Sequence, residues 1–166
     1  MAEFDNRGLE ISTPSPQAAD HYRAGVDLLL SAWPGAEDVL RQALNCDEQF
    51  ALAHAALARL YAITSEPAEA RKRITAAEDI VTRHGSPREA SHVAILSLAI
   101  GGQSSKALDS ALAHLDRWPR DVLILSLPLG AFGLFAFSGM ADHDQARVEL
   151  CERVADQYDA DDWWFL

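Results

Sequence analysis

The sequence predicts an all-α fold, an α-solenoid of about four stacked antiparallel helical hairpins. Alanine and leucine together make up 50 of the 166 residues, a bias that is typical of helices and unlike that of β-sandwiches or barrels. Apolar residues recur at helical spacing in segments separated by short breaks. An internal repeat with a 34-residue offset links the first and second quarters of the chain, and such repeats are the sequence signature of solenoids.

The first four expected helices form two hairpins. Ser15 can cap the first helix, over residues 16–32, and Pro16 suits its first helical position. Trp33-Pro34-Gly35 then ends it. The next helices are expected over residues 36–45, 49–64 and 68–83, with breaks at Asp47-Glu48 and at Ser65-Glu66-Pro67.

The last four expected helices cover residues 87–100, 104–117, 120–137 and 142–158, with breaks such as Gly101-Gly102 and Trp118-Pro119. At the start of this half, Gly85 suits the end of the fourth helix, while Ser86 and Pro87 begin the fifth. The uncharged stretch 122–141 just reaches the length of about 20 residues that spans a bilayer. Because Pro128 and several glycines interrupt it, we expect a buried helix and not a membrane span.

The internal repeat predicts where helices cross. Ala24, Ala36, Leu40 and Ala43 recur 34 positions later as Ala58, Ala70, Ile74 and Ala77. Small residues at Ala24 and Ala58 would let two helix backbones approach closely. We therefore expect both side chains to be buried at helix crossings.

This frame resembles the tetratricopeptide repeat, which needs a small residue where its two helices cross and an aromatic residue three positions on, here Ala58 and Tyr61. The segments NCDEQFALAHAALA, SPREASHV and ALAHLDRWPRDVL are similar to the N-terminal part of the tetratricopeptide repeat protein 38 family. The resemblance implies repeats over residues 16–158, an N-terminal extension over 1–15, and the start of a further, truncated helix over 159–166. It implies no activity, because that family has no firmly established one.

Charge and cysteine content exclude several classes of function. The net charge of −11 repels phosphate backbones and anionic membranes, so we expect no nucleic-acid partner and no membrane binding. Cys46 and Cys151 lack the spacing of a metal site, which favours two reduced thiols in a cytoplasmic protein. No phosphate-binding glycine motif, metal motif or nucleophile motif occurs, so no metal, cofactor or catalytic residue is predicted.

Polar residues that interrupt the apolar helices are the candidate site residues. Arg88 and His92 lie four positions apart and therefore share one helical face. In stacked hairpins the first helix of each hairpin lines the concave groove, so His54 and His92 can face the same groove. The complete set is His54, Arg88, Glu89, His92, His114 and Asp121.

Two interpretations of this set stay open. It can bind an anionic peptide end or a small carboxylate, or it can form a buried ion-pair network that fixes the angle between hairpins. The predicted function is a non-enzymatic module or scaffold that binds a protein or peptide partner on its concave face. Alternatives are a small-ligand-binding protein or enzyme with a His/Arg/Glu pocket, and a membrane-associated scaffold using residues 122–141. The aromatic run Trp163, Trp164 and Phe165 is expected to favour self-association.

Overall fold

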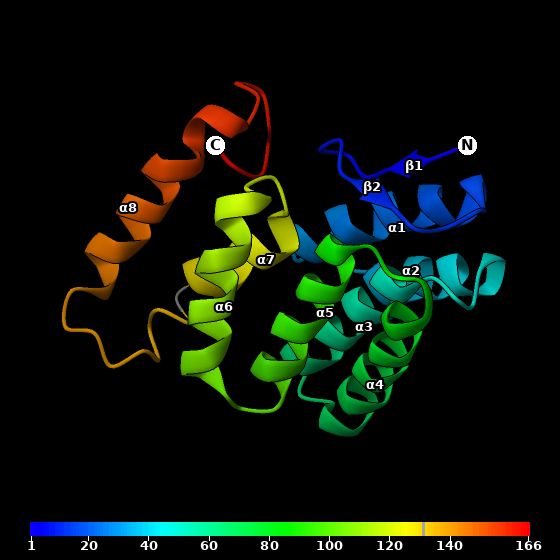
Figure 1. Cartoon of the computed structure of the whole chain (residues 1–166), viewed down its shortest axis with the longest axis horizontal. Helices are drawn as coiled ribbons and strands as arrows, with labels where there is room; N and C mark the ends of the chain where they lie inside the picture. Colours follow the sequence, from blue (N-terminus) through cyan, green and yellow to red (C-terminus); the bar gives the residue numbers. More distant parts are fainter. Residues whose placement is uncertain (131) are drawn as a thin grey trace.

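The computed structural model describes residues 1–130 and 132–166, and this part of the chain is helical apart from one short two-stranded hairpin (Figure 1). The all-α class is therefore confirmed, and the first six helices agree with the expected bounds to within two residues. The elements are β1 (Glu3–Phe4), β2 (Glu10–Ile11), α1 (Pro16–Leu30), α2 (Ala36–Cys46), α3 (Ala51–Ile63), α4 (Pro67–His84), α5 (Pro87–Ile100), α6 (Ser104–Arg117), α7 (Val122–Leu129), α8 (His143–Val154) and the 3-10 turn η1 (Ala155–Gln157).

Local capping explains why the helix starts were predictable. The Ser15 hydroxyl accepts a hydrogen bond from the amide of Ala18 at the start of α1. At α5, the Ser86 hydroxyl accepts from the Glu89 amide, and the Glu89 carboxylate accepts from the Ser86 amide, which completes a capping box. Both helices have a proline in the first turn. These bonds satisfy amides that have no partner within the helix.

The uncharged segment forms a much shorter helix than expected. α7 ends at Leu129, and the chain then turns back so that the Leu134 amide donates to the carbonyl of Leu127 at 2.8 Å. A Cβ atom at Gly133 would lie 2.5 Å from the Pro128 carbonyl oxygen, so this tight return requires glycine. The expectation of a helix to residue 137 is therefore wrong. No helix among residues 1–130 and 132–166 has the length and apolar character needed to cross a membrane.

Of the two alanines predicted to be buried at helix crossings, the structure buries one. Ala58 is fully buried, as expected, but Ala24 is exposed, and its neighbour Gly25 makes the close approach instead. A Cβ at Gly25 would lie 2.6 Å from the Leu40 side chain on α2. The α1–α2 connection is five residues long and the α3–α4 connection three, so the repeat does not hold its register on α1. A slip of one residue turns a helix by about 100°.

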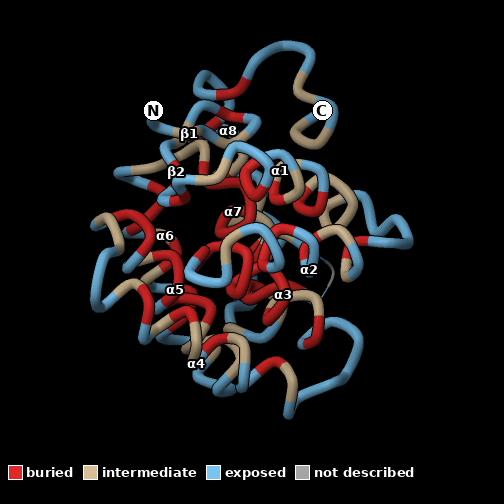
Figure 2. Tube along the Cα trace, turned by 90° about the vertical axis from the view of Figure 1, so that its right-hand side faces the viewer, coloured by how far each residue is buried: buried red, intermediate tan, exposed pale blue. Residues whose placement is uncertain are grey.

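The first and last helices of the core, α1 and α7, pack against each other. Consecutive helices from α1 to α7 contact one another, and α1 also contacts α7. Tyr22 and Val26 of α1 belong to the same buried cluster as Val122 and Leu123 of α7. Figure 2 shows buried residues along α3, α5 and α7 in the interior. This part of the expected concave face is therefore filled by side chains.

The C-terminal part lies at the edge of this core. In Figure 1, α8 stands beside α6, and Arg153 of α8 pairs with Asp116 of α6 at 3.2 Å. The expected helix start over residues 159–166 is a series of turns. Phe165 stacks on Tyr158 with ring centroids 4.3 Å apart, whereas Trp163 is about half exposed. Trp164 and Phe165 of this segment pack against the core.

Candidate functional site

Four of the six predicted site residues meet at the carboxylate of Asp121, the residue before α7. Arg88 Nη1 donates to Asp121 Oδ2 at 2.7 Å. His92 Nδ1 lies 3.0 Å from the same oxygen, and His114 Nε2 lies 3.1 Å from it. Arg88 and His92 come from one face of α5, and His114 comes from the last turn of α6. The cluster thus joins α5, α6 and the start of α7; we call it the Asp121 cluster.

The Asp121 cluster is inside the protein. The exposed fractions of Arg88, His92, His114 and Asp121 are 7 %, 1 %, 2 % and 3 %. Burial alone would raise the pKa of the Asp121 carboxyl, but His92, His114 and Arg88 outweigh it and hold that pKa well below its usual range. Charge-assisted hydrogen bonds of this kind are strong, and removing one partner leaves a buried charge unpaired.

The hydrogen-bond pattern assigns protons on both histidines. A carboxylate only accepts, so His92 Nδ1 and His114 Nε2 carry protons toward Asp121. His114 Nδ1 lies 2.8 Å from the Ser91 hydroxyl, which donates to it when the ring is neutral. His92 Nε2 is buried and finds no hydrogen-bond partner among the described residues.

The contacts Ser91–His114–Asp121 follow the order of a Ser-His-Asp triad. In such a triad the aspartate accepts a hydrogen bond from the histidine alone. The serine hydroxyl faces the substrate, next to hydrogen-bond donors that stabilise the oxyanion. Here Arg88 and His92 share the Asp121 carboxylate, and Trp118 packs on the His114 ring at 4.8 Å. This arrangement favours a structural network over a catalytic relay.

The N-terminal segment, residues 1–15, covers the Asp121 cluster. Arg88 Nη2 donates to the Glu10 carbonyl at 2.8 Å. Glu89 accepts hydrogen bonds from the Ser12 amide at 2.8 Å and from the Ser12 hydroxyl at 2.6 Å. Thr13 donates to Asp47 at 2.6 Å. The predicted extension is therefore a folded part of the domain, and Glu89 fastens it in place and makes no bond to Asp121.

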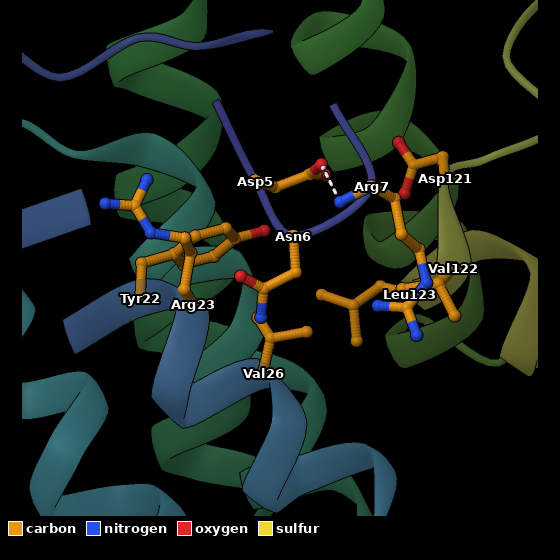
Figure 3. Close-up of a pocket in the computed structure, with 9 residues that line it drawn as sticks. All are labelled: Asp5, Asn6, Arg7, Tyr22, Arg23, Val26, Asp121, Val122 and Leu123. Atoms are coloured by element: carbon orange, nitrogen blue, oxygen red, sulfur yellow. Dashed lines mark hydrogen bonds between the residues drawn. The ribbon is translucent and has the colours of Figure 1, made fainter. Parts of the chain in front are cut away.

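A small cavity lies between this segment, α1 and α7 (Figure 3). Its volume is about 10 Å³, which is room for about one water molecule. Asp5 and Arg7 border it, and the Arg7 amide donates to Asp5 Oδ1 at 2.9 Å. Its other polar lining residues are Asn6, Tyr22, Arg23 and Asp121. Burial raises the pKa of Asp5. A cavity of this size does not admit a substrate.

His54 does not join the Asp121 cluster. It lies on α3, where Nε2 is 3.0 Å from the Glu48 carbonyl oxygen and Nδ1 is 3.5 Å from Arg73 Nη1. Burial lowers the pKa of His54. Its contacts tie α3 to the preceding turn and to α4, and they are separate from those of His92.

The residues whose contacts hold the N-terminal segment against the core were not predicted from the sequence. Arg7 forms an ion pair with Asp162, and Ser12 binds Glu89. The run Asp5-Asn6-Arg7-Gly8 is a turn signal that would have indicated a hairpin. Nothing in the sequence pairs Arg7 with Asp162, since the two lie 155 positions apart.

Comparisons with protein-family models, with curated proteins and with solved structures find no match. The resemblance to the tetratricopeptide repeat, and to the repeat protein 38 family, therefore stays a prediction. Within residues 1–130 and 132–166, no three His, Cys, Asp or Glu side chains are grouped so that they could hold a metal ion.

Proposed function

We propose that this chain is a binding protein that takes up an apolar segment of a protein or peptide partner. The observation that carries the proposal is an exposed apolar hollow of about 420 Å³ where α1 and α3 end, which we call the Trp33 hollow. Trp33 and Ile63 at this hollow are 68 % and 54 % exposed. Its other apolar lining includes Leu28, Leu29 and Leu60.

The turn between α1 and α2 holds the tryptophan in a defined position. The Trp33 amide donates to the Leu28 carbonyl at 2.9 Å, and Ala32 and Gly35 adopt left-handed backbone conformations. A preorganised aromatic side chain next to a hollow has the character of an interface hot spot. Covering one large apolar side chain contributes about 1.5–3 kcal/mol.

The net charge of the chain favours a basic partner, and the carboxylate nearest the hollow is already paired with Arg41. Glu37 lines the Trp33 hollow, and hydrogen bonds from Tyr61 at 2.8 Å and Arg41 at 2.9 Å lower the pKa of its carboxyl. The whole chain carries a net charge of −11. An amphipathic helix with apolar residues on one face and lysine or arginine beside them complements this surface.

The proposed partner is still a protein or peptide, as the sequence predicts, but the proposed binding surface is the Trp33 hollow and not the concave face. The Asp121 cluster is buried, so its polar atoms are not accessible to a partner. By contrast, Trp33 and Ile63 at the Trp33 hollow are exposed, so a partner can cover them.

A peptide selection tests the proposal. A phage-displayed library of random peptides is selected on the immobilised chain, and the affinities of the recovered peptides are measured for Trp33→Ala and Ile63→Glu. We expect basic peptides with apolar residues at helical spacing, which bind both variants at least tenfold more weakly. Val148→Glu introduces the same charge at an exposed apolar position on α8 and should leave binding unchanged. Peptides that bind all variants equally would contradict the proposal.

A further inference from the structure

A second hollow, which we call the Arg59 hollow, lies beside the C-terminal half of α3 and has a different chemistry. It is formed by α3, α5, the start of α6, α7 and residues 132–137, and its volume is about 200 Å³. Arg59 is its one charged lining residue. Apart from Ser104, the other lining residues are apolar, among them Leu96, Leu127, Phe132, Leu134 and Phe137.

Arg59 has no counter-charge among residues 1–130 and 132–166. Within the described part of the chain, its guanidinium forms no ion pair and no hydrogen bond. Burial lowers the pKa of Arg59, and no carboxylate offsets this effect. Arg23 and Arg88 are paired with carboxylates, whereas the exposed Arg71 forms no ion pair among the described residues either. What distinguishes Arg59 is its position at a mostly apolar hollow. Arg59 is only partly buried, and none of its nitrogens is among the enclosed side-chain atoms that lack a hydrogen-bond partner. Its charge is therefore accessible to an anionic ligand, and pairing with that ligand would offset the cost of partial burial.

The surroundings of Arg59 define the rest of the ligand. Leu96, Leu127 and Leu134 supply an apolar wall, and the exposed rings of Phe132 and Phe137 stand at the rim. Arginine binds a carboxylate through two parallel hydrogen bonds. The volume is below the 300–1,000 Å³ or so of pockets for drug-sized molecules, which favours a small ligand.

We propose that the Arg59 hollow binds a small monocarboxylate with an apolar tail, whose carboxylate pairs with Arg59 and whose tail packs against Leu127, Phe132 and Phe137. Six-carbon to eight-carbon acids are the size class that the hollow fits. The site shares no lining residue with the Trp33 hollow, so it is independent of the proposed peptide binding.

Calorimetric titration of the full chain with hexanoate, 1-hexanol and acetate tests the pairing. We expect saturable binding of hexanoate with a Kd of about 1 mM or tighter. 1-Hexanol lacks the charge and acetate lacks the tail, so both should bind at least tenfold more weakly. Hexanoate binding that is no tighter than that of 1-hexanol would overturn the proposal.

Variants then locate the site. Arg59→Met should remove the preference for hexanoate over 1-hexanol, whereas Arg59→Lys should retain it. Arg71→Met removes an exposed charge on α4 and should change nothing. Ala62 is exposed and lines the hollow, so Ala62→Trp should fill the hollow and abolish hexanoate binding while Arg59 is intact. Unchanged hexanoate binding in Ala62→Trp, with a melting curve like that of the natural chain, would place the acid elsewhere and refute the site.

Discussion

Asp121→Asn is the sharpest test of the Asp121 cluster. The change keeps the shape of the side chain and removes the charge that accepts from Arg88, His92 and His114 at 2.7, 3.0 and 3.1 Å. Hydrogen bonds to a charged group are worth about 1.5–3 kcal/mol each. Because asparagine keeps one acceptor oxygen, but leaves the buried Arg88 charge unpaired, we expect a loss of about 3–5 kcal/mol in the free energy of unfolding.

Urea denaturation at pH 7, followed by circular dichroism, measures this loss. The control is Asp116→Asn, which removes the ion pair with Arg153 on the exposed side of α6 and α8. We expect that change to cost less than about 1 kcal/mol. A loss below about 1 kcal/mol for Asp121→Asn as well would refute the interpretation of the cluster as a stabilising network.

The remaining predictions concern pH, helix packing and the N-terminal segment. The pKa of the Asp121 carboxyl is depressed in the folded protein, so the stabilisation it provides is complete above the unfolded pKa of about 3.9 and is lost as the pH falls through the folded pKa. When the free energy of unfolding is measured against pH in this range, it should therefore fall less steeply for Asp121→Asn than for the natural chain. Ala58→Leu overpacks a buried crossing and should cost about 1–3 kcal/mol, whereas Ala24→Leu, at an exposed position, should leave the urea midpoint nearly unchanged. Ser12→Ala removes the hydroxyl bond to Glu89, so limited proteolysis should cleave the N-terminal segment faster, with the first cuts within residues 1–15. A proteolysis pattern identical to that of the natural chain would show that this bond does not fasten the segment.

Most helices could be predicted because their ends are set by neighbouring residues. Ser15 and Ser86 make capping bonds within three positions, and these signals are visible in the sequence. The end of α7 could not be predicted in this way, since the segment has no charge pattern and its turn depends on contact between Gly133 and Pro128. The exposure of Ala24 likewise depends on how α1 packs on α2.

Only those relations between site residues that lie within a single helix could be predicted from the sequence. The spacing of Arg88 and His92 places both on one face of α5. Their meeting with Asp121, 33 and 29 positions away, requires the packing of α5 on the start of α7. The contact between Ser12 and Glu89 spans 77 positions, and no local pattern records it. Because of these non-local contacts, the residues of the Asp121 cluster lie inside the protein and not along an open groove.

Hydrogen-exchange mass spectrometry with a peptide from the selection locates the binding surface directly. If the partner binds the Trp33 hollow, the peptide will protect the amides of residues 28–36 and 60–64. Protection confined to residues 88–92 and 120–123, around the Asp121 cluster, would show instead that the buried polar residues form the binding site.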